Sequence, residues 1–128
     1  MKFLNIAAAL MLMVALILSL KSSVPPPDDP WFEQAVTRQP RPVLVKFGAE
    51  WCPPCRYLEA VLDRVEDRLQ GRVKIVRVDV DEKQALARHY GISSIPRLML
   101  FRDGRLVASH GGFADPDALQ TWLDRATP

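Results

Sequence analysis

Cysteine is scarce in this chain, with only two among its 128 residues. Two cysteines exclude a scaffold of several disulfides and a zinc site of four cysteines. An excess of charge of one sign is also lacking, because 17 lysines and arginines are balanced by 15 aspartates and glutamates. These charges are interspersed, without the concentrated basic stripe of a nucleic-acid-binding protein. The composition therefore favours one small globular domain that binds no nucleic acid.

A long uncharged run occupies residues 3–20, near the amino terminus. As a helix it would reach roughly 27 Å, close to the thickness of a bilayer's hydrocarbon core. Lys2 precedes the run, and Asp28 and Asp29 lie beyond it, which by the positive-inside rule favours a cytoplasmic amino terminus and an exported remainder. We therefore predict a transmembrane anchor or a signal peptide over residues 1–21, with the run contacting the membrane.

The fate of this segment has two alternatives. A cleaved secretory signal has a shorter apolar region, followed by a small-x-small cleavage site. Here Lys21 occupies the third position before a cut after Ser23, where a small residue is needed. We favour an uncleaved anchor that holds the remaining chain on the periplasmic side of the membrane. The alternative is a soluble exported domain after signal cleavage.

A proline-rich segment follows, since residues 22–30 read SSVPPPDDP. Such a composition favours extended polyproline-like geometry and a semi-rigid linker. The globular domain is then expected over residues 31–128.

Helical and strand patterns alternate in that domain. Asp-Pro pairs mark the starts of two helices, and Asp103-Gly104 between two apolar runs marks a hairpin turn. The predicted elements are a helix over 30–37, strand 43–47, a helix from Cys55 to Gly71, strand 73–80, a helix capped by Asp81 that reaches Tyr90, hairpin strands 98–101 and 106–109, and a closing helix from Pro116. This order predicts an α/β fold, with a central mixed sheet flanked by helices.

The pair Cys52-Pro53-Pro54-Cys55 has three physical uses: half of a zinc site, a structural staple or a redox dithiol. Zinc would need two more ligands, and His89 and His110 lack the spacing of a zinc pair, so we predict no metal. A disulfide that closes a four-residue loop stabilises the folded protein by roughly 2 kcal/mol, whereas one that closes a 100-residue loop contributes nearly 5 kcal/mol. A single structural disulfide would therefore be expected to span a longer loop. The redox use fits best, because Cys52 lies at a strand-to-helix junction, where backbone N–H groups and the helix dipole stabilise a thiolate.

Around these cysteines the sequence resembles the thioredoxin family. Ala49-Glu50-Trp51-Cys52-Pro53-Pro54-Cys55 is similar to the family's active-site segment, with Pro53 in place of glycine. Tyr90-Gly91-Ile92, Ile95-Pro96 and Leu100-Phe101 followed by Asp103-Gly104 are similar to its later motifs, at the family's own spacing. The resemblance covers about residues 31–126.

The resemblance implies a thioredoxin fold and a redox-active Cys52–Cys55 disulfide. It implies that Cys52 attacks, that Cys55 resolves the mixed disulfide, and that Ile95-Pro96 is a cis-proline segment pairing with substrate backbone. Trp51 would be the partly exposed indole beside the active site. No cofactor is expected.

Three departures from the family pattern stand out. Lys46 takes the position of a buried aspartate thought to assist proton transfer, and strand alternation puts it on the face opposite Val45 and Phe47. It is therefore a candidate for tuning the thiol pKa. Gly48 replaces a second tryptophan, and the linker replaces the family's first strand, which we expect to be short or absent.

We predict a thiol-disulfide oxidoreductase that acts on exported proteins, with protein-disulfide reduction favoured over oxidation or isomerisation. Its partners would be protein disulfides or dithiols and an unidentified electron donor or acceptor. A cation such as Lys46 or Arg77 near the thiolate would instead make the disulfide more oxidising. The alternative from another class is a tethered binding module without turnover.

Overall fold

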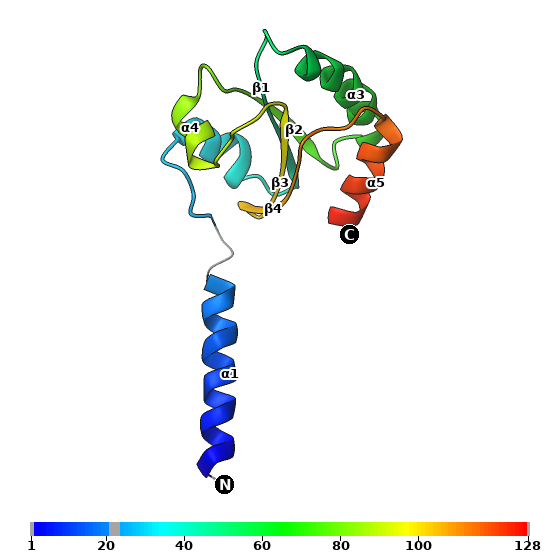
Figure 1. Ribbon diagram of the computed structural model, residues 1–128. Helices are drawn as coiled ribbons and strands as arrows, with labels where there is room; N and C mark the ends of the chain where they lie inside the picture. Colours follow the sequence, from blue (N-terminus) through cyan, green and yellow to red (C-terminus); the bar gives the residue numbers. More distant parts are fainter. Residues whose placement is uncertain (1, 21–23, 128) are drawn as a thin grey trace.

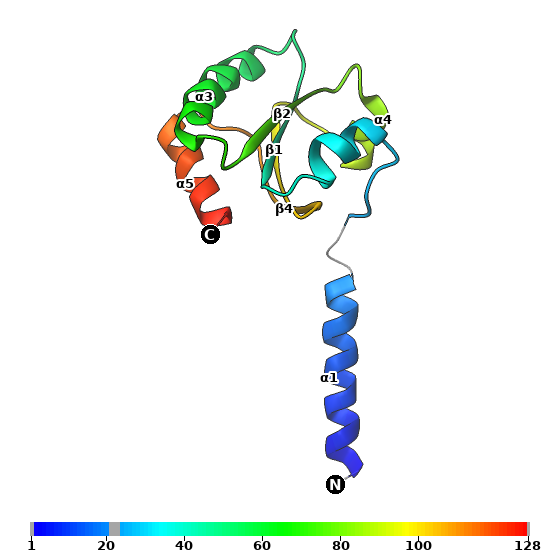
Figure 2. The ribbon, with the colours of Figure 1, turned by 180° about the vertical axis from the view of Figure 1, so that it is seen from behind.

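The computed structural model of the protein describes residues 2–20 and 24–127 (Figures 1 and 2). Helix α1, Lys2–Leu20, stands apart from the globular domain in both views. The elements of the domain are α2 (Pro30–Phe32), the π-helical turn η1 (Glu33–Thr37), β1 (Val43–Gly48), α3 (Pro53–Leu69), β2 (Lys74–Asp79), α4 (Gln84–His89), β3 (Arg97–Arg102), β4 (Arg105–His110) and α5 (Pro116–Ala126).

The four strands form one mixed sheet in the order β2-β1-β3-β4. Strand β1 pairs parallel to β2 and antiparallel to β3, and β3 pairs antiparallel to β4. This confirms the predicted α/β fold with a mixed sheet between helices. In the described part of residues 22–42 no strand precedes β1, in agreement with the expected loss of the family's first strand.

Apolar cores cover both faces of the sheet. On one face, Leu44 and Leu100 pack against α3 and α5. On the other face, Val45, Phe47 and Phe101 pack against α2, η1 and α4. Figure 1 shows these helices on opposite sides of the strands. Because side chains alternate along a strand, Lys46 lies opposite Val45 and Phe47, as predicted, and shares the α3 face with Leu44.

Local sequence signals account for most helix starts and turns. The Asp29 carboxylate accepts a hydrogen bond from the Phe32 N–H at 3.0 Å, and Asp115 caps α5 in the same way through the Asp117 N–H. Asp103 and Gly104 have φ values of 51° and 77°, which gives the predicted hairpin its tight turn. These signals are short-range, so the sequence alone reveals them.

The prediction that Asp81 caps the fourth helix is wrong. Helix α4 begins at Gln84, and its N-cap position, Lys83, makes no side-chain capping bond. The carboxylate of Asp79 instead accepts hydrogen bonds from the N–H groups of Asp81 and Glu82, which closes a turn before the helix. The Asp81 carboxylate accepts a hydrogen bond from the Trp51 indole N–H.

The proline-rich segment makes specific contacts with the domain. His89 Nε2 lies 2.6 Å from the Pro25 carbonyl oxygen. Lys83 pairs with Asp29 at 3.1 Å, and its ammonium lies 4.8 Å from the centre of the Trp31 ring. Residues 25–31 are therefore held against α4 and the loop before it.

Helix α1 carries the uncharged run of the amino terminus. Throughout residues 2–20 and 24–127, the structure contains no helix with both the length and the apolar character needed to cross a membrane. The transmembrane anchor or signal peptide expected over residues 1–21 stays a prediction. The predicted cleavage region and the start of the linker, residues 21–23, lie outside the described residues.

Candidate functional site

The two cysteines lie at the start of α3, directly after β1, and form a disulfide. Cys52 is the N-cap of α3, and its Sγ accepts a hydrogen bond from the Cys55 N–H at 3.3 Å. Pro53 occupies the first helical position, where the missing N–H causes no loss. The side chains of Cys52 and Cys55 are both buried. A sulfur in this N-cap position would be stabilised as a thiolate by the helix N-terminus.

The segment before β3 comes against the disulfide. The Ile95–Pro96 peptide bond is cis, and the Ile95 carbonyl oxygen lies 3.9 Å from Cys52 Sγ. This agrees with the cis-proline segment implied by the resemblance. On the other side, Trp51 is 66% exposed, and its indole Nε1 donates to the Asp81 carboxylate at 2.8 Å. The indole is thus held on the surface beside the sulfurs rather than in the core.

Lys46 lies beneath the disulfide, on the α3 face of β1. It is the buried charged residue of the described core, at 8% exposure. Its Nζ donates to Glu59 Oε1 at 2.5 Å. Position 59 is four residues after Cys55, so Glu59 and Cys55 share one face of α3.

Arg77 of β2 reaches the same carboxylate from the neighbouring strand. Its Nε lies 2.8 Å from Glu59 Oε2, and its guanidinium also reaches Asp63 and Glu66 at 3.3 and 3.4 Å. Burial acts to raise the pKa of Glu59, but the hydrogen bonds and charges of Lys46 and Arg77 outweigh burial and hold this pKa below its ordinary value. The Glu59 carboxylate therefore stays ionised between two cations.

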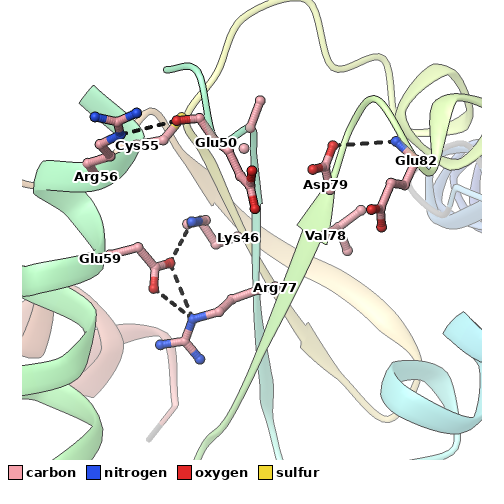
Figure 3. A pocket seen from close by; sticks show the side chains of 11 residues that line it. Lys46, Glu50, Cys55, Arg56, Glu59, Arg77, Val78, Asp79 and Glu82 are labelled. Atoms are coloured by element: carbon pink, nitrogen blue, oxygen red, sulfur yellow. Dashed lines mark hydrogen bonds and ion pairs between the residues drawn. The ribbon is translucent and has the colours of Figure 1, made fainter. Parts of the chain in front are cut away.

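A cavity of about 660 Å³ opens beside this cluster (Figure 3). Gly48 explains part of the space, because a Cβ there would come within 3.1 Å of Lys46 Cε and 3.2 Å of Cys55 Sγ. The absence of a side chain at position 48 thus lets the lysine stem and the Cys55 sulfur both approach Gly48. The lining comprises Lys46, Gly48, Ala49, Glu50, Cys55, Arg56, Glu59, Arg77, Val78, Asp79 and Glu82.

Comparison with known proteins identifies the family. The Thioredoxin family model matches residues 24–125. The chain is 42% identical over 96 residues to thioredoxin of Pseudomonas aeruginosa, covering 75% of this chain and 89% of that protein. It is 37% identical over 98 residues to thioredoxin of Rickettsia conorii, covering 77% and 93%. For thioredoxin of Synechocystis sp. the identity is 38% over 104 residues, covering 81% and 97%. The chain belongs to the thioredoxin family.

Membership of this family, together with the Cys52–Cys55 disulfide, makes the protein a thiol-disulfide oxidoreductase. The thioredoxin match begins after residue 23, so helix α1 lies outside it. Two contacts of the site were not predicted from sequence: the Asp81 bond to Trp51 and the Glu59 pair with Lys46. Each joins two different parts of the fold, so its existence depends on how those parts pack.

Proposed function

We propose that the protein reduces disulfides in other proteins through its Cys52–Cys55 dithiol. The observation that carries this proposal is the disulfide at the N-terminus of α3, with Cys52 against the cis-proline segment. The Cys52 thiolate attacks a substrate disulfide, forms a mixed disulfide and releases one substrate thiolate. The Cys55 thiolate then attacks Cys52 Sγ and releases the second. Two electrons pass to the substrate, and the two cysteine protons end on its thiols.

In this proposal, the surface around Cys52 binds the substrate backbone. Ile95 precedes the cis bond, and its carbonyl lies beside Cys52 Sγ, where an extended substrate segment would pair with it. The exposed Trp51 indole provides an apolar contact on the other side. Trp51, Ile95 and Pro96 are therefore the proposed substrate-binding residues.

Lys46 is proposed to tune the thiols. Two versions differ in sign. A charged ammonium would stabilise a thiolate and favour the reduced protein, whereas a neutral amine would accept the Cys55 proton. The ionised Glu59 carboxylate next to Lys46 supports the charged version.

Reduction of insulin disulfides tests the activity. The reduced protein with a recycling thiol should precipitate insulin chains at a rate well above that of the thiol alone. A binding module without turnover would leave the rate at the background level, and that outcome would overturn the proposal. The equilibrium reduction potential of the protein then discriminates a reductase from an oxidase or isomerase, because a potential as high as that of strong oxidants contradicts reduction as the main direction.

We also propose that the substrates are exported proteins. Support comes from Lys2 before the uncharged run of α1, and from the position of this helix outside the matched residues 24–125. Mass spectrometry of the protein recovered from cell fractions tests the proposal. A full-length chain in the membrane fraction fits the tethered version, and a mature chain starting near Ser22 or Ser23 outside the cytoplasm fits signal cleavage. Full-length protein confined to the cytoplasm contradicts both.

A further inference from the structure

The cluster behind the disulfide contains one carboxylate shared by two cations. Glu59 Oε1 accepts from Lys46 Nζ at 2.5 Å, and Glu59 Oε2 accepts from Arg77 Nε at 2.8 Å. Figure 3 shows the three side chains converging from β1, α3 and β2 on the wall of the cavity. A Cβ at Gly48 would lie 3.1 Å from Lys46 Cε and 3.2 Å from Cys55 Sγ, so the lysine stem and the sulfur are close to the same point. The net charge that Lys46 presents there depends on its pairing with Glu59.

We propose that Glu59 is a positioning residue of the redox reaction, which acts through Lys46 by offsetting part of the ammonium charge on the Cys55 side of β1. Glu59 thereby limits how strongly Lys46 stabilises the cysteine thiolates. The inference rests on the proposed dithiol chemistry. It assigns a role to a residue of α3 whose carboxylate binds the two cations.

The neighbouring charges favour this assignment. Asp63 and Glu66 contact the outer side of the Arg77 guanidinium and are 70% and 46% exposed in their side chains. Glu59 is 32% exposed, and among the acidic residues paired in the described structure it is the one that contacts Lys46. The other ionisable groups around the cavity are Glu50, Arg56, Asp79 and Glu82. Solvent screens exposed charges more strongly than partly buried ones, so Glu59 should have the larger effect on the sulfurs.

The sign of the effect follows from the charge that remains. Glu59→Gln keeps the size of the side chain but leaves the Lys46 charge less compensated, which stabilises the thiolate and hence the dithiol. Lys46→Met removes the cation and favours the disulfide. The two substitutions should therefore shift the dithiol–disulfide equilibrium in opposite directions. A pair that merely supported the fold would give shifts of the same sign or none.

The experiment measures this equilibrium against a glutathione redox buffer at pH 7, using the full chain. Glu59→Gln should move the equilibrium constant about threefold to thirtyfold toward the dithiol, the scale of one partly solvated charge several ångströms away. A tenfold change corresponds to 29.6 mV. Lys46→Met should move it the other way. The double variant Lys46→Met/Glu59→Gln should lie between the two single variants.

Glu66→Gln is the matched control, since it makes the same chemical change on the same helix and also loses a contact to Arg77. It should shift the equilibrium less than twofold. If Glu59→Gln shifts the equilibrium in the same direction as Lys46→Met, or no more than Glu66→Gln, the inference is wrong. Thermal unfolding of each variant checks that it is folded, and the double variant supplies the sign if Glu59→Gln alone does not fold. Insulin reduction by the unsubstituted protein is measured separately, so failure of the proposed function is distinguishable.

Discussion

Two neighbouring residues of β1 point into different surroundings. Phe47 is fully buried among apolar side chains, with the Tyr90 ring centre 6.2 Å away. Tyr90 is a partly buried side chain packed against this core, and burial raises its pKa to about 12. Lys46 faces α3 and lies between a carboxylate and a cavity that reaches Cys55. One side of the strand thus contributes mainly stability, and the other side places charge behind the reacting sulfurs.

The largest loss of activity should come from substituting the cysteines, because Lys46 can affect the chemistry only through their sulfurs. Cys52→Ser should abolish disulfide exchange, because the attacking sulfur is gone. Cys55→Ser should accumulate mixed disulfides with substrates, because nothing resolves them. Non-reducing electrophoresis with mass spectrometry of the trapped adducts measures both. Alkylation of the reduced protein at low pH that labels Cys55 before Cys52 would reverse these roles.

On the apolar side, Phe47→Ala should be strongly destabilising. Removal of a fully buried phenyl ring leaves a cavity, and such substitutions lower the free energy of unfolding by about 3–5 kcal/mol. Denaturant unfolding of the oxidised protein gives this value. The reduction potential of the variant that remains folded should change little. A large shift in the reduction potential without loss of stability would contradict the conclusion that the Phe47 face of β1 contributes mainly stability.

On the charged side, Lys46→Met should leave the fold intact and change the chemistry. Loss of a cation near the sulfurs should make the reduction potential more negative, with an equilibrium shift of about threefold to thirtyfold. The pH profile of Cys52 alkylation should move to higher pH. If Lys46 is instead a neutral base, the potential should move little while resolution of the mixed disulfide slows. Unchanged potential, alkylation profile and resolution rate would make Lys46 purely structural.

The smallest effect concerns the dependence of stability on acid. The pKa of Glu59 is lowered in the folded protein, so its ion pairs contribute stability above the unfolded pKa and lose it as pH falls through the folded pKa. The unsubstituted protein should therefore lose stability below about pH 4.5 more steeply than Glu59→Gln, by less than about 1 kcal/mol for this partly exposed pair. Chemical unfolding at pH 7 and at pH 3 measures the difference. Equal losses in both proteins would contradict it.

Local patterns explain why much of the site was predictable. Strand alternation placed Lys46 on the face opposite Val45 and Phe47, and the cysteine spacing with its family resemblance placed the disulfide and the cis-proline segment. Asp81 was assigned to the wrong task, because a helix cap is a local prediction and the Trp51 indole competes for the same carboxylate. Glu59 was not identified, since the sequence does not reveal how α3 lies over β1. The anchor was predicted from the length, hydropathy and flanking charges of residues 1–21, and it stays a prediction.

The contacts of the proline-rich segment change how far the domain extends from its amino-terminal helix. As a free polyproline chain, residues 25–31 would add about 20 Å of reach. The His89 contact to Pro25 and the Lys83 contacts to Asp29 and Trp31 hold this segment along α4, so its length does not add to the reach of the domain. While these contacts persist, residues 25–31 form part of the domain and do not act as a free linker. If these three contacts break, residues 25–31 can extend again and increase the distance between α1 and the redox centre.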